Sequence, residues 1–589
     1  MASVFLLIAV VAPAAIAKDP KTTDIQILAL NDFHGQLEVV NPIASSAGRI
    51  GSLQGDRPNQ TCIPGGTPNC IPAGGAEYLA THVRDLRAEN PSGTVFVTAG
   101  DNIGATPLLS ALFHDEPTIE ALDLMGLDFA SVGNHEFDEG IDELLRMQNG
   151  GCHPIDGCGD GDGFKGADFQ YLAANVTYKA GQPGAGEPIF PPYAIKKFPG
   201  GAEVAFIGMT LEGTPLIVSP LGIQTVDFLD ETETVNALVD ELKDQGIEAI
   251  VVLLHEGGSV PASGNGAGNV GAINSCVDAT GPIVDMVPNF DDEIDIVITG
   301  HTNWAVNCLI DGKVVTGAAA QGRLVTDIDA QIDRSTGDFV PGSIEANNTI
   351  VTQDVPKAKE ITRLIAKYNV FAGPIAAVVV GNVTAPMDRA EVTPGGESTL
   401  GRLIADAQLA SSQAAGDEGV VAFMNPGGIR GNLDAGDVTH GEAFGVQPFS
   451  NIVTTMTLTG AQIETMLEQQ FTVNTGSSAG SLRSLGPTIL LPSTGFAYTW
   501  DPAGPAGDRV DPDTMMLNDE LIDPAGTYRV VVNNFLATGG DDFPILNSGT
   551  ERVTGDDDLV ALEAYLADHN PYTPVDLTVD FQITRAAAP

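Results

Sequence analysis

The chain is poor in basic residues. It has 27 Lys and Arg against 77 Asp and Glu over 589 residues, a formal net charge of −50. A surface of this charge repels nucleic acid and anionic membranes at long range, so we expect no duplex nucleic acid as partner. An anionic substrate would need bound cations, or a local group of arginines, to reverse the field inside a cleft.

Long hydrophobic runs are also missing beyond the N-terminus. The apolar run at 4–11 is too short to span a membrane, and no later segment reaches the roughly 18 unbroken apolar residues of a spanning helix. Ala15-Ile16-Ala17 is a small-x-small cleavage pattern, so we interpret residues 1–17 as a signal peptide, although Lys and Arg are absent before the apolar run. A truncated or cytosolic start is the alternative. The sequence thus predicts a secreted, periplasmic or extracellular protein, with the cell wall as one location, and indicates no obligate protein partner.

The six cysteines contain no CxxC pair. Six cysteines can pair in fifteen ways, and neighbour spacing favours 62–70, 152–158 and 276–308. The first two pairs would close small Gly- and Pro-rich loops. Zinc binding is the alternative, and the lack of CxxC argues against it. Disulfides would agree with export.

The chain is too long for one core, so at least two domains are expected, and no internal repeat of fixed period occurs. Apolar, β-rich runs alternate with segments that have the pattern of amphipathic helices, such as 77–90 and 234–245. The β-rich runs are 25–30, 94–99, 129–132, 249–254 and 294–299. This alternation predicts a layered α/β domain over 24–345. Gly- and Pro-rich stretches at 52–75 and 150–168 indicate insertion loops. Residues 355–369 predict a helix followed by a turn at FAGP. This linker, 355–372, leads to a second α/β region at 375–585.

Each of the five β-rich runs is followed by polar groups that can bind metals. They are Asp32, His34, Asp101, Asn134, His135, His255, His301 and Asn303. Ligands gather at the carboxyl ends of strands in open α/β sheets, so these residues are expected at one edge. Their mixed shell suits two divalent ions of the Zn, Mn, Co or Fe type, with one carboxylate as a bridge. For any one of these segments, a polar loop that happens to contain a histidine is the simpler interpretation. Five such segments in order, each after a strand, favour a metal site.

His135 need not be a metal ligand in such a centre. It could hold the transferring phosphoryl group or the leaving oxygen, and Asp138, three residues later, could orient its ring. The chain contains, in this order, the motifs Asp-x-His, Gly-Asp, Gly-Asn-His-Glu, a later His and Gly-His-x-Asn. This set of motifs resembles that of the calcineurin-like metallophosphatases.

The segments LALNDFHGQLE, VGNHEFDEG and NPGGIRGNL look more narrowly like the secreted bacterial 5′-nucleotidase and UDP-sugar hydrolase family. The resemblance covers about 24–585. It implies an α/β fold in which two stacked sheets flanked by helices form an N-terminal metallophosphatase domain. A helix would join this domain to a C-terminal nucleotide-binding domain.

The same resemblance assigns substrate contacts in the second half. The candidate residues are Asn425, Arg430, Phe449, Asn451, Phe535 and Asp541. It implies that the two phenylalanines sandwich the base and that Asp541 binds ribose hydroxyls, while an arginine fork suits phosphate. Core packing of the phenylalanines and a surface ion pair of Arg430 are the alternatives. Arg389 is the nearest counterpart of a further phosphate arginine, and Arg402 stands where many relatives carry Asn. His82, His114, His153, His440 and His569 fall outside the motifs and receive no role.

We therefore expect a secreted two-metal phosphohydrolase that removes phosphate from 5′-nucleotides by in-line attack of a metal-held hydroxide. The alternatives are a UDP-sugar hydrolase, a 2′,3′-cyclic nucleotide phosphodiesterase, or a non-catalytic acidic or Ca²⁺-binding surface protein. Since the metal ligands precede residue 304 and the base contacts follow residue 424, the nucleotide should lie between two domains. The linker helix and its FAGP turn would then form a hinge region.

Overall fold

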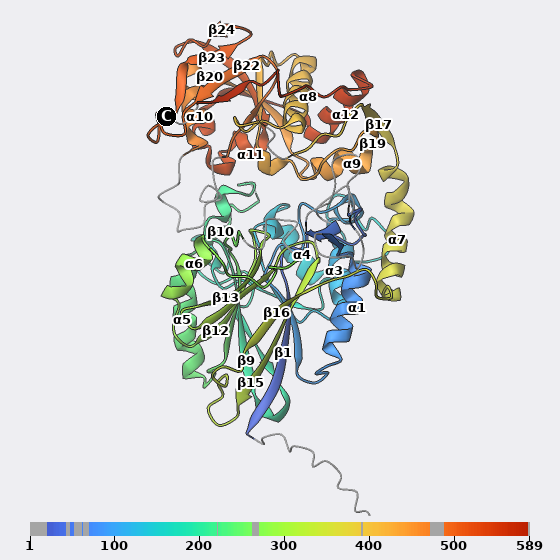
Figure 1. Ribbon diagram of the computed structural model, residues 1–589, viewed down its shortest axis with the longest axis vertical. Helices are drawn as coiled ribbons and strands as arrows, with labels where there is room; N and C mark the ends of the chain where they lie inside the picture. The colour runs from blue at the N-terminus through green and yellow to red at the C-terminus, as the bar shows by residue number, and fades with distance from the viewer. Residues whose placement is uncertain are drawn as a thin grey trace, which may run out of the picture.

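The computed structural model describes residues 21–42, 48–51, 62, 70–220, 222–261, 270–389, 393–471 and 488–586. The chain forms two parts, an N-terminal part in blue to yellow-green and a C-terminal part in orange to red, stacked along the long axis (Figure 1). The expected signal peptide and most of the loop expected at 52–75 lie outside the described residues. The end of that loop forms β3 (Cys70–Pro72), which pairs with β2 (Arg49–Gly51).

Two six-stranded sheets build the N-terminal part. The first has the order β16-β15-β1-β4-β5-β6 and comprises β1 (Thr22–Leu30), β4 (Thr94–Thr98), β5 (Phe129–Ser131), β6 (Gln170–Leu172), β15 (Leu324–Asp333) and β16 (Glu345–Ile350). The second has the order β13-β14-β12-β11-β9-β8 and comprises β8 (Tyr193–Lys197), β9 (Glu203–Thr210), β11 (Ile250–His255), β12 (Ile294–Thr299), β13 (Ala305–Ile310) and β14 (Lys313–Ala318). The central strands run parallel in both sheets. Antiparallel strands lie at both edges of the second sheet and at the β15–β16 side of the first, whose other edge strand, β6, is parallel.

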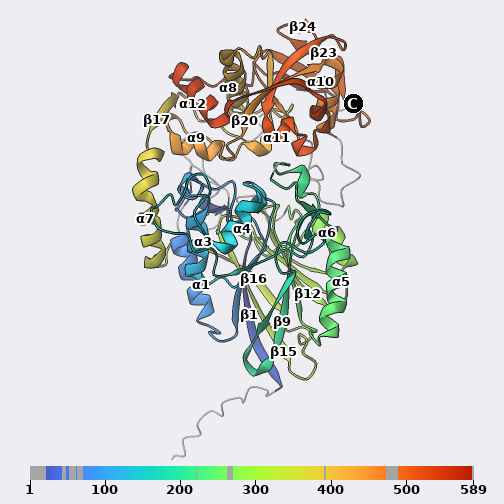
Figure 2. The same cartoon turned by 180° about the vertical axis from the view of Figure 1, so that it is seen from behind.

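The two sheets stack face to face, because alternate residues of each strand are apolar on the inner side. Ile25 and Ile27 of β1 pack there with Val251 and Leu253 of β11. Helices α1 (Ala76–Arg87), α3 (Glu116–Met125) and α7 (Lys359–Ala376) cover the outer face of the first sheet. Helices α5 (Glu231–Asp244) and α6 (Pro282–Met286) cover that of the second, as Figures 1 and 2 show from opposite sides. This arrangement confirms the expected pair of stacked sheets flanked by helices.

The C-terminal part is also α/β. A five-stranded sheet has the order β21-β18-β25-β20-β26 and comprises β18 (Val421–Met424), β20 (Ile452–Thr459), β21 (Leu491–Pro492), β25 (Thr527–Asn533) and β26 (Thr550–Asp557). A four-stranded sheet comprises β22 (Phe496–Trp500), β23 (Val510–Leu517), β24 (Glu520–Leu521) and β27 (Ile583–Arg585). Strands β17 (Val379–Val383) and β19 (Gly436–Thr439) form a separate pair.

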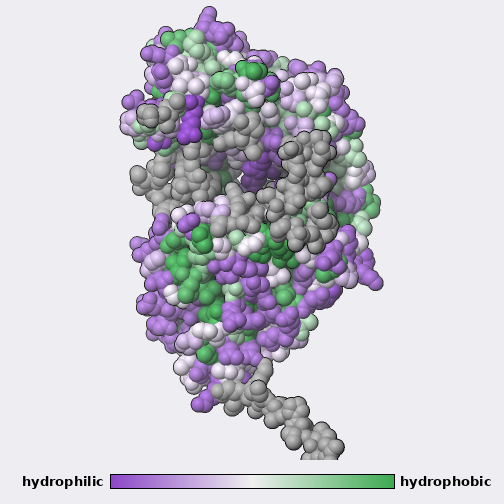
Figure 3. All heavy atoms as spheres, viewed as in Figure 1, coloured by the Kyte–Doolittle hydropathy of each residue, from purple (hydrophilic) through white to green (hydrophobic). Residues whose placement is uncertain are grey.

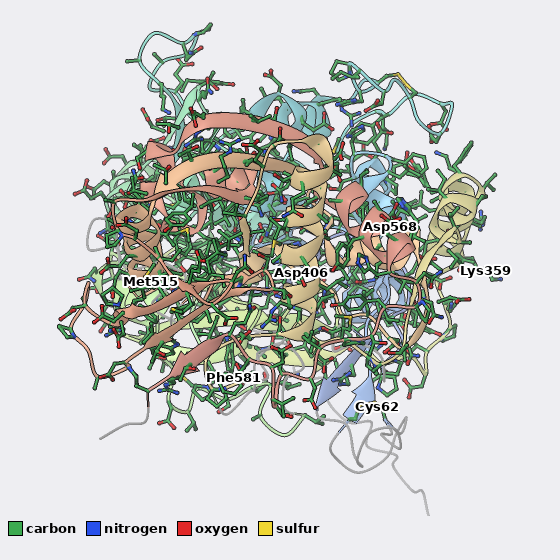
Figure 4. All side chains as sticks on the ribbon, turned by 90° about the horizontal axis from the view of Figure 1, so that it is seen from above. Cys62, Lys359, Asp406, Met515, Asp568 and Phe581 are labelled. Carbon is green, nitrogen blue, oxygen red and sulfur yellow. A yellow bond between two sulfur atoms is a disulfide. The ribbon has the colours of Figure 1, made fainter. Side chains whose placement is uncertain are left out.

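Helices line both sides of the five-stranded sheet. Helices α8 (Thr399–Ala415) and α12 (Asp558–Asp568) pack together in one core; Figure 4 labels Asp406 on α8 and Asp568 at the end of α12. Helix α10 (Gly460–Gln469) belongs to a second core with the four-stranded sheet. The short helices α9 (His440–Val446) and α11 (Asn534–Ala537) lie on the side that faces the N-terminal part.

Helix α7 differs from the expectation. It begins at Lys359, after an extended Ala358, and it runs through FAGP to Ala376 with Pro374 inside it. The expected FAGP turn is therefore wrong. Ile361, Leu364, Tyr368 and Ala372 lie on one helical face and are buried in the core below the first sheet. These residues place α7 up to Ala372 in the N-terminal core, whereas Ala376, beyond Gly373 and Pro374, packs against the C-terminal core.

The three expected disulfides are present, joining Cys62 to Cys70, Cys152 to Cys158 and Cys276 to Cys308. The alternative of cysteine-bound zinc is therefore wrong. Among the described residues, no helix has both the length and the apolar character needed to cross a bilayer.

Candidate metal centre and nucleotide cleft

A cavity of about 700 Å³ lies between the two parts. Its N-terminal wall includes His34, Asp101, Asn134, His135, Asp138, His301 and Asn303. Its C-terminal wall includes Arg389, Asn425, Arg430, Phe449, Asn451, Phe535 and Asp541. Figure 3 shows one face of the molecule with the hollow between the parts and hydrophilic residues inside it. The fold thus gathers residues from both halves of the chain at one place, and Asp32 and His255 lie buried beneath the cavity floor.

The loops that carry the candidate ligands have an unusual backbone. Asp32, His34 and Asp101 have φ values of 50°, 47° and 51°. His301 and Asn303 have φ values of 66° and 60°. Non-glycine residues rarely adopt this left-handed region, and such strain gathers at functional sites where the surroundings enforce it. Here the enforcing contacts join neighbouring strand ends: the amide of His34 donates to the carbonyl of Asp101 at 3.0 Å, and that of His301 to Oδ2 of Asp32 at 3.0 Å.

Two groups of possible ligands share Asp101. One comprises His34, Asp101 and His135, and the other Asp101, His255 and His301; within each group the ligand atoms lie within 4.8 Å of one another. Oδ2 of Asp101 is 3.0 Å from Nε2 of His255 and 3.8 Å from Nε2 of His34. A carboxylate placed between two groups of imidazoles can bridge two metal ions.

The donor atoms of this centre fit metal ions. Nε2 of His301 and Oδ1 of Asp32 are buried and have no hydrogen-bond partner, and the buried Nε2 of His255 lies 3.0 Å from Oδ2 of Asp101. Nδ1 of His255 is bonded to the carbonyl of Ala99 at 2.7 Å, and Nδ1 of His34 to that of Gly104 at 2.9 Å. These bonds place a proton on Nδ1 and leave the Nε2 lone pair free to bind a metal.

Burial also keeps two of these imidazoles neutral. It lowers the pKa of His34 to about 3 and the pKa of His301 to about 3, in each case against a smaller opposing effect of Asp101. Neutral imidazole is the form that coordinates metals. Buried, unprotonated and unpaired ring nitrogens therefore indicate that ions complete this site.

Glu136 supports both ligand loops. Its buried carboxylate accepts hydrogen bonds from the amides of Asp101 (2.8 Å), Asn102 (2.8 Å) and Gly133 (2.5 Å). Sequence reasoning included Glu136 in the Gly-Asn-His-Glu motif but gave it no role. The available signal was a carboxylate placed inside an otherwise buried strand-to-loop junction.

The ring of His135 is held by Asp138, as expected. Nδ1 of His135 is 2.8 Å from Oδ2 of Asp138, and the backbone amide of His135 donates to Oδ1 of Asp101 at 2.9 Å. Burial lowers the pKa of His135, but the carboxylates of Asp138 and Asp101 outweigh it, so the pKa is raised. His135 is therefore suited to hold a proton beside the centre.

The opposite wall carries the candidate substrate contacts. Nδ2 of Asn425 donates to Oδ2 of Asp541 at 2.7 Å. Nη1 of Arg389 donates to the carbonyl of Arg430 at 3.2 Å, so both arginines line the same wall. The guanidinium carbon of Arg430 lies 5.7 Å from the ring centroid of Phe449. An arginine pair beside two half-buried phenylalanines that line the cavity, Phe449 and Phe535, can bind phosphate and a base together.

Comparison with known proteins agrees with this architecture. Residues 25–304 match the calcineurin-like phosphoesterase model, and residues 379–548 match the 5′-nucleotidase C-terminal domain model. The cell wall protein Lmo0130 of Listeria monocytogenes is 31% identical over 582 residues, covering 93% of this chain and 67% of the relative. The chain belongs to the 5′-nucleotidase family.

Other relatives of the chain differ from it in length. Endonuclease YhcR of Bacillus subtilis is 32% identical over 569 residues, covering 96% of this chain but 41% of the relative. The chain thus spans less than half of that protein. The 5′-nucleotidase precursor of Thermus thermophilus shares the fold, with a TM-score of 0.72 at 24% identity over 96% of this chain and 100% of that chain.

One position that departs from the family pattern lies outside the cleft. Arg402 is buried on α8, where it pairs with Glu397. The second carboxylate oxygen of Glu397 accepts the amides of Gln582 and Ile583 at 2.8 Å each. Arg402 therefore ties α8 to the C-terminal strand, and it does not line the cavity.

Proposed function

We propose that this protein is a secreted, metal-dependent 5′-nucleotidase that hydrolyses the phosphate ester of nucleoside 5′-monophosphates. The observation that carries the proposal is the shared cavity. One space of about 700 Å³ has metal-binding donors on one wall and two phenylalanines with two arginines on the other. A nucleotide joins a phosphate to an aromatic base, so it can reach both walls at once.

Two divalent ions of the Zn, Mn, Co or Fe type would be held around Asp101. His34, His255 and His301 would supply nitrogen donors, and Asp32, Asn134 and Asn303 would supply oxygens. When bound, such ions polarise the phosphoryl oxygens and lower the pKa of water. Glu136 would fix the positions of Asp101 and of the Gly133 loop through its three amide bonds.

The protein's own side chains orient and neutralise the substrate. Arg430 and Arg389 bind phosphate oxygens, while His135, held by Asp138, hydrogen-bonds the transferring phosphoryl group or protonates the leaving oxygen. Phe449 and Phe535 stack on the base, and Asp541 binds the ribose hydroxyls. Asn425 orients Asp541 and, with Asn451, offers further hydrogen bonds.

Two arginines on the cleft wall supply the local positive charge that an anionic substrate needs in a protein of net charge −50. Together with the bound cations they would reverse the field where the phosphate enters. The same charge argues against duplex nucleic acid as the substrate. UDP-sugar hydrolysis and 2′,3′-cyclic nucleotide hydrolysis are the alternatives, because a cavity of this size can hold larger nucleotides.

Phosphate release from AMP, UDP-glucose and 2′,3′-cyclic AMP tests the proposal. We expect AMP to be hydrolysed with the highest kcat/KM, activity to disappear after exhaustive chelation, and Zn²⁺, Mn²⁺ or Co²⁺ to restore it. A higher kcat/KM for either other substrate would replace 5′-nucleotidase by that activity. Full activity in protein shown to be metal-free by elemental analysis would refute the metal dependence, and no activity on any of the three would favour the acidic surface protein.

Export is part of the proposal. Three disulfides suit an oxidising compartment, and the Listeria relative is named a cell wall protein. The N-terminal sequence of the protein recovered outside the cytoplasm should begin after Ala17. Recovery of the uncleaved chain in the cytoplasm alone would refute export.

A further inference from the structure

Two histidines outside the sequence motifs meet at the rim of the cleft. His114 lies between α2 (Leu108–Ala111) and α3, and His153 lies in the loop closed by Cys152 and Cys158. Their rings stack with 3.7 Å between centroids and 19° between planes. His114 also lines the nucleotide cavity, so this pair borders the proposed active site.

Asp156 joins the two rings. Its Oδ2 lies 3.0 Å from Nε2 of His114 and 3.2 Å from Nδ1 of His153. His114, His153 and Asp156 can each offer one ligand atom within 4.8 Å of the others. Two donors bound to one tetrahedral Zn²⁺, each at about 2.0–2.1 Å, lie roughly 3.3 Å apart, so the observed separations are close to those of a metal site.

The hydrogen bonds around the rings leave a place for a cation. Nδ1 of His114 donates to Oε2 of Glu139 at 2.7 Å, and its Nε2 lies 3.0 Å from Oδ2 of Asp156, so either a proton or a cation can lie between these two atoms. Nδ1 of His153 accepts the amide of Asp156 at 3.2 Å, a hydrogen bond that a cation on this nitrogen would replace.

In the metal-free protein a proton on His114 supplies positive charge between Glu139 and Asp156, since the hydrogen bond to Glu139 raises the pKa of His114 to about 9. A second proton on the stacked His153 would place two imidazolium ions 3.7 Å apart between centroids, and like charges so close repel. One divalent cation could replace the proton of His114 and bind all three donors without that repulsion. Glu139 would then act as the carboxylate that orients a metal-binding histidine, an arrangement common at zinc sites.

The loop that supplies two of the donors is held in shape before any ion binds. The Cys152–Cys158 disulfide closes it, and backbone hydrogen bonds join His153 and Gly157 in both directions, at 3.1 and 2.9 Å. The Asp156 side chain is 62% exposed, so an ion can reach the site from solvent. A shell of two imidazoles and a carboxylate suits Zn²⁺ and similar borderline ions, whereas Ca²⁺ and Mg²⁺ prefer oxygen donors.

We propose that His114, His153 and Asp156 form a third divalent-cation site of the zinc class, separate from the proposed two-metal centre. An ion here would join the loop closed by Cys152 and Cys158 to His114 at the rim of the cleft. It would also add positive charge beside a cavity edge that carries Glu139 and Glu143, where an anionic nucleotide enters a strongly acidic protein.

Metal content tests the proposal. The full chain is stripped with chelator, reloaded with Zn²⁺, freed of loosely held ions and measured by elemental analysis. We expect about three equivalents in the wild type and about one fewer in His153→Ala and in Asp156→Asn. His569→Ala, at an exposed histidine beside Tyr565, is the matched control and should equal the wild type.

A second comparison separates this site from the two-metal centre. His301→Ala should lose metal from the centre and keep the ion that His153→Ala loses, so the double variant should bind less Zn²⁺ than either single variant. His153→Ala should retain hydrolysis of AMP, which also shows that it folds. The proposal is overturned if His153→Ala and Asp156→Asn both bind as much Zn²⁺ as the wild type, or if the wild type binds no more than two equivalents.

Discussion

The rings of His135 and Phe449 face each other across the cleft, with 5.8 Å between centroids and 15° between planes. His135 belongs to the N-terminal part, and Phe449 to the C-terminal part. A ring proposed to bind the base thus lies almost against the histidine proposed to act on the phosphate. Small relative movements of the two parts would change the space between them.

Domain movement is therefore expected in turnover. Within α7, Ala372 packs in the N-terminal core and Ala376 packs against the C-terminal core, so we place the hinge between them, at Gly373 and Pro374 of the helix. Motion between the domains of one chain is the ordinary expectation. A disulfide engineered between η4 (Thr214–Leu216) and η8 (Gly540–Asp542), two segments in contact across the parts, should lower kcat sharply, and reductant should restore it. Unchanged multiple-turnover hydrolysis of AMP by the locked protein would exclude the movement.

His135→Ala should lower kcat by roughly 10²–10⁴ while both metals of the centre stay bound, because this ring acts on the substrate and its Nδ1 is bonded to Asp138. His301→Ala should instead lower metal content, since its buried Nε2 has no partner within the protein. Kinetics and elemental analysis of the two variants separate the roles. Loss of one metal in His135→Ala would make His135 a ligand.

Phe449→Ala and Phe535→Ala should each weaken AMP binding. Base stacking on an aromatic ring contributes about 1–3 kcal/mol, or roughly 5- to 150-fold in KM. Hydrolysis of glycerol phosphate, which has no base, should change far less. Phe371→Ala, at a half-exposed ring on α7, is the control. Equal losses on AMP and glycerol phosphate would indicate that these rings support the site instead of binding the base.

Glu136→Gln should reduce metal affinity by about 10–100-fold, the usual effect of losing a group that orients metal ligands. The carboxylate accepts hydrogen bonds from three backbone N–H groups. The NH₂ group of Gln would face at least one of these N–H groups and could not accept its hydrogen bond. Competition with a chelating dye measures the change, with Glu187→Gln on an exposed loop as control. Affinity equal to that of the wild type would show that the loops hold their shape without this carboxylate.

The stability of the metal-free protein should depend on pH through His114. The hydrogen bond to Glu139 raises the pKa of His114 to about 9, with further contributions from Glu143 and Asp156. The folded state therefore binds this proton more tightly than the unfolded state, whose histidine pKa is about 6.5. The stabilisation is complete below about pH 6.5 and is lost as pH rises through about 9.

Denaturant unfolding from pH 6 to pH 10, in the presence of chelator, checks this expectation. His114→Gln should be less stable than the wild type at pH 6, and the difference should shrink by pH 10. The stacked His153 faces the same carboxylate, so His153→Gln is measured alongside. A stability difference that does not vary with pH would contradict the raised pKa of His114.

Local sequence patterns located the strands that carry the site and the polar residues that follow them. Nearly unbroken apolar runs mark β1 and β11, because both faces of these strands are buried, and the polar residues after them lie at the sheet edge. Pairing each cysteine with its neighbour in sequence also predicted the three disulfides, two of which close short loops. Family motifs then located the residues of the C-terminal wall.

Features that depend on packing between distant residues could not be predicted from local patterns. FAGP carries local signals for a turn, but the helix continues through it, with Ala372 packed in the N-terminal core and Ala376 against the C-terminal core. Glu136 reveals its role only when the amides of Asp101 and Asn102, more than thirty positions away, converge on it. His114 and His153 share no motif and meet only because a disulfide loop folds back against the rim of the cleft. Local patterns specify strands and turns, whereas contacts between residues far apart in sequence are fixed by the packing of the complete chain.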